Sequence, residues 1–264
     1  MNTRINKIFS KKSKKLLTFV TGGDPNLRTS RKIIDILSNN GADLIEIGMP
    51  FSDPMADGPT IQLSSNRAIL QNINLNNIFD LCKKFRQNNS VTPLILMGYY
   101  NVIYNYGLKN FINKCEKTNI DGLIIVDLQP EEDTQLLDLM KNKNIDLIRL
   151  ITPTTDKNRL KTILKNASGF LYYVTITGIT GQQSADIKIL KKQIKEIKKE
   201  TNLPVVAGFG IKSVSQVREV CKFSDGVVVG SAIVKIIEKN IKSKKKHILQ
   251  LIKNFVIKLK KGTL

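Results

Sequence analysis

The sequence lacks tryptophan altogether and has one histidine and three cysteines. Cys82, Cys115 and Cys221 lie far apart and form no Cys-x-x-Cys pair, which excludes a disulfide scaffold or a cysteine-rich zinc site and is typical of a reducing compartment. His247 follows three lysines in a segment with helical periodicity, where we expect a solvated surface residue. Catalysis by a Ser-His or Cys-His pair is therefore not favoured.

Acidic residues are scarce at both ends of the chain. Residues 1–15 hold six basic residues and no acid, residues 188–264 hold 19 basic and 5 acidic, and residues 16–187 balance at 17 of each, so the formal charge of +20 comes from the ends. Lys, Ile and Asn, which have codons rich in A and T, number 34, 35 and 24, so the composition of an AT-rich genome accounts for much of the excess. Nucleic-acid binding is the less favoured alternative, because the basic stretches carry almost no aromatic side chains.

Long apolar segments are also missing. No apolar run reaches the roughly 18 residues of a membrane-spanning helix, which excludes a multi-pass membrane protein, and none has the length of a secretory signal. The basic N-terminus faintly resembles a transit peptide, but Ile5, Ile8 and Phe9 recur at helical spacing and favour a short amphipathic helix. We expect a cytoplasmic protein of an AT-rich bacterium or endosymbiont, or a stromal protein if the gene is in a plastid.

Two alternating patterns predict the fold. Continuous apolar runs typical of buried parallel strands occur at 16–20, 44–48, 94–97, 123–126, 147–151, 170–175, 205–209 and 227–229. Segments of helical periodicity follow at 30–37, 78–85, 111–115, 134–140, 160–164, 187–197, 214–220, 232–241 and 248–259. This alternation predicts an α/β protein with a single (β/α)8 TIM-barrel domain over 1–264, including an extra N-terminal helix in 1–15 and extra C-terminal helices that end in a basic helix at 242–264. A doubly wound sheet is the alternative, but residues 21–25 lack its Gly-x-Gly-x-x-Gly fingerprint.

In a TIM barrel the chemistry lies at the C-terminal ends of the strands. Glu46 lies inside the apolar run 44–48, where burial would raise its pKa and allow proton transfer near neutral pH, unless a buried structural partner pairs with it. Asp53 and Asp57 follow in a loop, 50–59, that contains three prolines. One of these acids could form a turn with its own backbone, but we do not expect both to do so. Tyr172 and its neighbour lie in the sixth run, where one should face into the barrel.

Glycines after the last two strands predict a phosphate site. Gly210 follows the seventh run, and Gly230 and Ser231 follow the eighth at the start of a helical segment. Barrels often bind phosphate in these two loops, because glycine lets backbone N–H groups approach the oxygens and a helix N-terminus favours negative charge. The residues alone thus indicate a barrel enzyme for a phosphorylated small molecule, with a carboxylate acid/base and no metal cluster or nucleotide fingerprint.

Several motifs resemble the α subunit of tryptophan synthase. They are LTFVTGGDP at 17–25, GADLIEIGMPFSDPMADGPTIQ at 41–62, MGYYN at 97–101, DLQPEE at 127–132, GITG at 178–181, GFGI at 208–211 and GSAIV at 230–234. The resemblance covers nearly the whole chain, and its most specific part is the block 50–60. It implies a carbon–carbon lyase that cleaves indole-3-glycerol phosphate by a retro-aldol step into indole and glyceraldehyde 3-phosphate.

The resemblance also implies roles for single residues. Glu46 would move protons at the indole ring carbon and the glycerol hydroxyl, Asp57 would hold the indole N–H and stabilise positive charge on the ring, and Tyr172 would help to orient the site. The other implied contacts are Gly181, Gly210, Gly230 and Ser231 for the phosphate, and Phe19 and Met97 for the indole.

A partner is implied as well. The family forms an α2β2 heterotetramer, in which a β subunit carries pyridoxal phosphate and converts the indole to L-tryptophan, so no cofactor is expected in this chain. Pro50 and Asp53 resemble the segment that meets the β subunit. Another phosphate-binding barrel enzyme of tryptophan synthesis is an alternative, but such an enzyme would lack the loop 50–59. A free-standing indole-3-glycerol phosphate lyase stays an alternative, as does, less favoured, a non-catalytic protein that binds polyanions or activates the β subunit.

Overall fold

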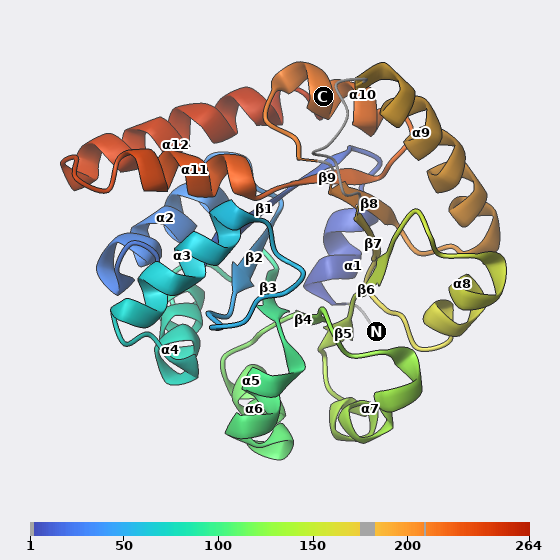
Figure 1. The fold of residues 1–264 in the computed structure, drawn as a ribbon, viewed down its shortest axis with the longest axis horizontal. Helices are drawn as coiled ribbons and strands as arrows, with labels where there is room; N and C mark the ends of the chain where they lie inside the picture. The colour runs from blue at the N-terminus through green and yellow to red at the C-terminus, as the bar shows by residue number, and fades with distance from the viewer. Residues whose placement is uncertain (1–2, 175–182, 209) are drawn as a thin grey trace.

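The computed structural model describes residues 3–174, 183–208 and 210–264. Within these residues, nine parallel strands form one sheet in the order β5-β4-β3-β2-β1-β9-β8-β7-β6 (Figure 1). Their bounds are β1 Lys15–Thr21, β2 Leu44–Gly48, β3 Leu94–Gly98, β4 Gly122–Ile125, β5 Asp146–Leu147, β6 Arg149–Ile151, β7 Leu171–Val174, β8 Val205–Gly208 and β9 Gly226–Val229. Each predicted apolar run is confirmed as a strand position over its described residues; Thr175 and Phe209, the last residues of two runs, lie outside them.

The fifth predicted strand is interrupted at Ile148, so it appears as two short strands. Its first half, β5, pairs with β4, and its second half, β6, pairs with β7. The backbone N–H of Ile148 donates to the carbonyl of Leu123 at 3.0 Å. The two ends of the sheet are thus halves of one strand, and the sheet nearly closes into the predicted single-domain α/β barrel.

Helices cover the outside of the sheet, except for the first, which lies at one end of the barrel (Figure 1). They are α1 Arg4–Phe9, α2 Leu27–Asn39, α3 Pro59–Leu70, α4 Leu75–Arg86, α5 Tyr100–Tyr106, α6 Leu108–Lys117, α7 Thr134–Met140, α8 Lys157–Leu164, α9 Gln183–Glu200, α10 Val214–Cys221, α11 Ser231–Lys239 and α12 Lys245–Lys260. The sequence pattern predicts neither α3 nor α5. The buried face of α3 consists of Ser64, Ser65 and Ala68, and α5 buries only Ile103, so neither has a clear apolar stripe.

The core has two layers, one inside the barrel and one between the strands and the helices. Alternate residues of a strand face opposite sides. Leu44 therefore belongs to the inner layer, whereas its neighbours along β2, Ile45 and Ile47, belong to the outer layer. Because both faces are covered, all five residues of β2 are buried, which explains why the strands are continuous apolar runs.

Helix α1 closes the N-terminal end of the barrel. Ile5 is fully buried in the inner layer, and the Phe9 ring lies 5.5 Å from that of Phe170. The Thr3 hydroxyl donates to the Asp146 carboxylate at 3.1 Å, and Arg4 pairs with Asp121 at 2.8 Å. The N-terminal segment is thus part of the folded barrel.

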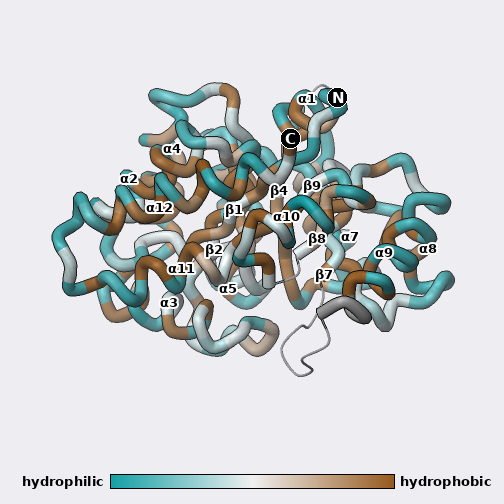
Figure 2. The backbone as a smooth tube through the Cα atoms, turned by 90° about the horizontal axis from the view of Figure 1, so that it is seen from above, coloured by the Kyte–Doolittle hydropathy of each residue, from teal (hydrophilic) through white to brown (hydrophobic). Residues whose placement is uncertain are grey.

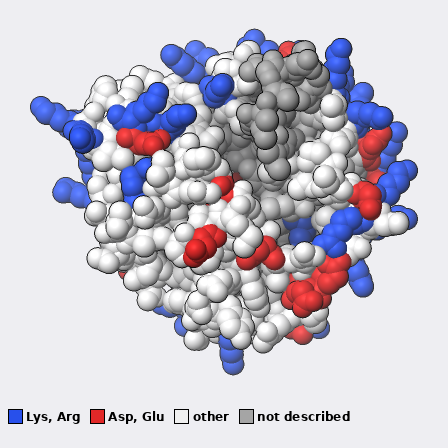
Figure 3. Space-filling view, in the orientation of Figure 1, with Lys and Arg blue, Asp and Glu red and all other residues white. Residues whose placement is uncertain are grey.

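The basic residues lie mainly on solvated helix faces. Helix α12 carries five lysines and no acid, yet it buries Ile248, Ile252, Val256 and Leu259 as one apolar stripe. Hydrophobic and hydrophilic positions alternate along the outer helices (Figure 2), and Lys and Arg gather mainly around the edge of the face shown in Figure 3. No helix in the described part of the chain is long and apolar enough to cross a membrane.

Candidate active site

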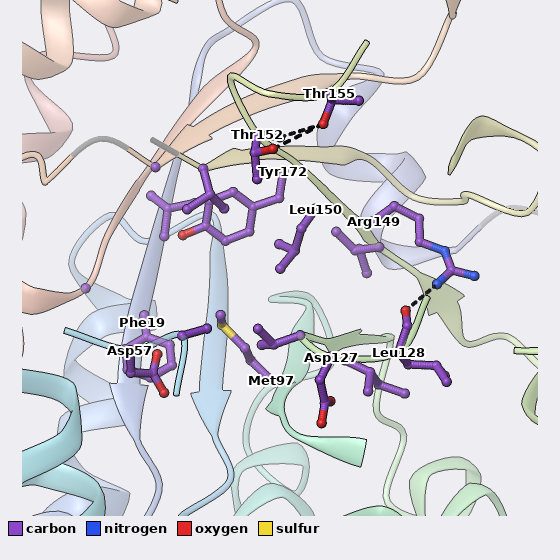
Figure 4. A pocket seen from close by; sticks show the side chains of 18 of the residues that line it. Phe19, Asp57, Met97, Asp127, Leu128, Arg149, Leu150, Thr152, Thr155 and Tyr172 are labelled. Carbon is purple, nitrogen blue, oxygen red and sulfur yellow. Dashed lines mark hydrogen bonds between the residues drawn. The ribbon is translucent and has the colours of Figure 1, made fainter. Parts of the chain in front are cut away.

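A cavity of about 790 Å³ opens at the C-terminal ends of the strands. Its lining includes Phe19 from β1, Met97 from β3 and Tyr172 from β7, together with Asp57 from the loop after β2. In Figure 4, Tyr172 lies across the cavity from Phe19, Asp57 and Met97. Residues that are far apart in the sequence therefore line one chamber, which is mostly apolar, with a few polar groups.

Glu46 faces the barrel interior from the middle of β2. It pairs in register with Phe19 on β1 and with Ile95 on β3, and its side chain is fully buried. Neither carboxyl oxygen has a hydrogen-bond partner within the described part of the chain, which disfavours a Glu that is paired only for structural reasons. Burial raises the pKa of Glu46 from 4.5 to about 8, so the group is mostly protonated at neutral pH.

Asp57 lies at the cavity wall near the end of the β2–α3 loop. Its backbone N–H donates to the Pro54 carbonyl at 3.0 Å, and its carboxylate accepts a hydrogen bond from the Tyr99 hydroxyl at 3.1 Å. Burial raises the pKa of Asp57, and the hydrogen bond from Tyr99 opposes this effect. The carboxylate is thus half-buried and held at one oxygen, while it still borders the cavity.

Side chains of α3 fix the backbone of the same loop. The Ser65 hydroxyl accepts from the Phe51 N–H at 2.7 Å and donates to the Phe51 carbonyl at 2.8 Å. The Gln62 amide donates to the Asp57 carbonyl at 2.8 Å. Arg67 forms a two-pronged ion pair, 2.8 Å at each contact, with the buried Asp24 of the β1–α2 loop. The helix that the sequence analysis missed therefore positions the loop that carries Asp57.

Two adjacent tyrosines on β7 point in opposite directions. Tyr172 belongs to the inner layer and lines the cavity, whereas the Tyr173 hydroxyl bonds to Gln193 of α9 on the outside. Burial raises the pKa of Tyr172 well above its ordinary value, and the charges of Glu46 and Asp57 raise it further. The three groups proposed from the sequence therefore lie within electrostatic reach of one another.

Three of the four residues expected at the phosphate, Gly210, Gly230 and Ser231, line the same cavity. Gly210 has a φ of +55°, a left-handed conformation that favours glycine, and Gly230 is the N-cap residue of α11, which begins at Ser231. A Cβ at Gly230 would lie 3.0 Å from the Cβ of Phe19, so the backbone approaches the cavity wall closely. Gly181 lies outside the described residues.

Comparison with known proteins identifies the family. The sequence model of the family described as tryptophan synthase alpha chain matches residues 5–263. The chain belongs to this family. It is 45% identical over 251 residues to the tryptophan synthase alpha chain of Citrifermentans bemidjiense, and the match covers 95% of this chain and 92% of that protein. Membership implies lyase activity in tryptophan synthesis and a β-subunit partner.

Solved structures of tryptophan synthases have the same fold. The tryptophan synthase alpha chain of Legionella pneumophila superimposes with a TM-score of 0.90 at 33% identity, over 99% of this chain and 97% of that one. A chain of Mycobacterium tuberculosis tryptophan synthase superimposes with a TM-score of 0.88 at 26% identity, over 99% of this chain and 98% of that one. The chain therefore shares its barrel fold with these relatives over nearly its whole length.

The residues expected at the partner surface, Pro50 and Asp53, lie in the β2–α3 loop. Asp53 is exposed, and its carboxylate accepts a hydrogen bond from the Ser52 hydroxyl; Pro50 is half-buried. Met55 is 80% exposed, which is unusual for a large apolar side chain. The loop therefore presents Asp57 to the cavity and Asp53 to solvent, while Met55 borders the cavity and is largely exposed.

Tyr99 and Arg149 are among the polar residues at the site that the sequence did not single out. Tyr99 lies directly after β3, in the quoted motif MGYYN, and is 2% exposed. Arg149, in β6, lines the cavity, donates to the Leu128 carbonyl at 3.2 Å and pairs with Asp133. Arg149 carried the same signal as Glu46, because it is a charged residue inside an apolar run. For Tyr99 the sequence contains no such signal.

Proposed function

We propose that this chain cleaves indole-3-glycerol phosphate into indole and glyceraldehyde 3-phosphate and passes the indole to a β subunit for the synthesis of L-tryptophan. The observation that carries the proposal is the carboxyl of Glu46, which is buried in the barrel interior with a pKa of about 8 and has no hydrogen-bond partner among the described residues. A group of this kind is protonated at neutral pH and can both donate and accept a proton there. Family membership and the cavity beside it support the same reaction.

Glu46 is the acid and the base of this reaction. As the acid it donates its proton to the indole ring carbon that bears the glycerol chain. As the base it then takes the proton of the hydroxyl on the adjacent glycerol carbon, the carbon–carbon bond breaks, and the electron pair returns to the ring as an aldehyde forms. Because Glu46 is fully buried behind the lining residues, its carboxyl turns toward the cavity to reach the substrate.

Asp57 and Tyr172 complete the proposed catalytic group. The Asp57 carboxylate accepts a hydrogen bond from the indole N–H and stabilises the positive charge that the ring gains when its carbon is protonated. Tyr172 orients the substrate from the opposite side of the cavity (Figure 4). Phe19 and Met97 provide apolar surface for the indole ring, and both line the cavity.

The phosphate binds at the other end of the substrate. Gly210, Gly230 and Ser231 offer backbone N–H groups beside the N-terminus of α11, whose dipole favours an anion. By family likeness Gly181 contributes a fourth contact. Held at these loops, the substrate directs its indole ring toward Asp57.

We also propose an α2β2 assembly. In it, Pro50 and Asp53 contact a β subunit that carries pyridoxal phosphate, while this chain works without a cofactor of its own. The exposed Met55 beside Asp53 supports a contact at this loop. The bacterial source of the relatives supports a cytoplasmic location.

The test is indole release from indole-3-glycerol phosphate by the purified chain, measured with and without a tryptophan synthase β subunit. We expect slow release by the chain alone and strong activation by the β subunit. A high rate that the β subunit does not change would indicate a free-standing lyase instead. Absence of indole under both conditions would refute the proposed reaction.

A further inference from the structure

Tyr99 connects the end of one strand to the catalytic loop of its neighbour. It follows β3 and is the N-cap residue of α5, with its side chain 2% exposed. Its ring centroid lies 5.2 Å from that of Phe51, at the start of the β2–α3 loop. The ring is therefore held by packing, and its hydroxyl reaches the far end of the same loop.

The hydrogen bonds of the Tyr99 hydroxyl have a defined direction. The backbone N–H of Ala56 lies 3.0 Å from the Tyr99 oxygen and can only donate, so the hydroxyl accepts this bond. The hydroxyl proton is then free for the Asp57 carboxylate, 3.1 Å away. One phenol thus holds the main chain before Asp57 and donates to its side chain.

Other side chains hold the loop at different atoms. Ser65 bonds the backbone of Phe51, and Gln62 bonds the backbone carbonyl of Asp57. Among the described residues, Tyr99 is the one that donates a side-chain hydrogen bond to the Asp57 carboxylate. Loss of its hydroxyl would leave the loop anchored but free the carboxylate to rotate.

We propose that Tyr99 is a positioning residue that aims the Asp57 carboxylate at the substrate ring. This inference rests on the function proposed above, in which Asp57 receives the indole N–H. A hydrogen bond donated to a carboxylate also stabilises its charged form, and the bond from Tyr99 lowers the pKa of Asp57 against the effect of burial. The phenol itself stays protonated, because burial and the charge of Asp57 both raise its pKa.

The other titratable groups near this pair come from other strands of the barrel. Tyr172 of β7 is influenced by the charges of Glu46 and Asp57, and Tyr99 is influenced by the charge of Asp127, after β4. None of these groups is removed by a Tyr99→Phe substitution. A change in the pH dependence of the variant would therefore report on Asp57 and its lost donor.

The test compares Tyr99→Phe with a matched control, Tyr104→Phe, in the full chain with a β subunit. Tyr104 lies in the adjacent helix α5 and is 64% exposed. We expect Tyr99→Phe to lower kcat/KM for indole release by at least about tenfold, on the scale of a hydrogen bond to a charged group. We also expect the acidic limb of its pH profile to move to higher pH, and the control to behave as the wild type.

A double-mutant cycle with Asp57→Asn separates this proposal from the proposed function. If Tyr99 acts through Asp57, adding Tyr99→Phe to Asp57→Asn causes little further loss. An equal loss in both backgrounds, or a Tyr99→Phe variant with normal rate and pH profile, would overturn the positioning role while leaving the reaction intact. Full activity of Asp57→Asn alone would instead contradict the proposed function.

Discussion

The buried carboxyl of Glu46 has a consequence for stability that can be worked out from its pKa. Burial raises the pKa to about 8 in the folded protein, against 4.5 for an ordinary glutamate. Between these two values the unfolded chain has lost the proton and the folded protein has kept it, so the free energy of unfolding falls as the pH rises. Each pH unit in this window lowers the free energy of unfolding by about 1.4 kcal/mol.

The substitution Glu46→Gln removes this dependence, because glutamine has a similar shape and does not titrate. Below pH 4.5 the carboxyl is protonated in both the folded and the unfolded chain, so we expect the free energy of unfolding to depend on pH in nearly the same way in the variant and the wild type. Between pH 4.5 and about pH 8, the free energy of unfolding of the variant should increase by roughly 3–5 kcal/mol relative to that of the wild type. The expected gain follows from full burial, which leaves no solvent to screen the charge.

The assay is urea unfolding at a series of pH values from 5 to 8.5, with Glu200→Gln as the control. Glu200 is exposed at the end of α9, so its variant should follow the wild-type curve. The two Gln variants should therefore diverge steadily as the pH rises. Parallel curves for Glu46→Gln and the wild type would show that Glu46 is not held protonated by burial, and the acid–base role would lose its physical basis.

Three further predictions concern activity, phosphate binding and the loop anchors. Glu46→Gln and Asp57→Asn should each lower the rate of indole formation by at least about a hundredfold, the usual scale for acid–base groups, and near-normal turnover in either variant contradicts the assigned roles. Gly230→Ala should raise the KM for indole-3-glycerol phosphate and weaken inhibition by inorganic phosphate, because the added Cβ would meet an aromatic side chain at 3.0 Å; an unchanged inhibition constant argues against the phosphate site. Arg67→Ala should lower the free energy of unfolding by about 3 kcal/mol, since it leaves the carboxylate of Asp24 buried without its partner, and a loss below about 1 kcal/mol in urea titrations would show that the pair is unimportant.

Strand positions could be predicted because both faces of each strand are buried. A strand in this barrel contacts the inner layer on one side and the helices on the other, so every position selects an apolar residue. A charged residue in such a run stands out, which is why Glu46 could be identified from the sequence. The bounds of β2 and the run 44–48 coincide for the same reason.

Helices with polar buried faces could not be predicted in this way. α3 packs through Ser64 and Ser65, which are buried because they bond the Thr21 hydroxyl and the Phe51 backbone. Two of its supporting contacts, Ser64 with Thr21 and Ser65 with Phe51, join residues more than ten positions apart in the chain. Periodicity within the helix contains no information about such partners.

The sequence by itself determined the order of the strands and of the helices that carry an apolar stripe, the candidate carboxylates and the glycines of the proposed phosphate loops, because these depend on local patterning and on motifs. Only the tertiary structure decided that Tyr99 donates to Asp57, that Tyr172 rather than Tyr173 faces the cavity, and that Arg149 borders it. These facts depend on strand register and on side-chain direction across the barrel. Closing the sheet brings together residues that are separated by many positions in the chain, and this proximity exists only in the folded protein.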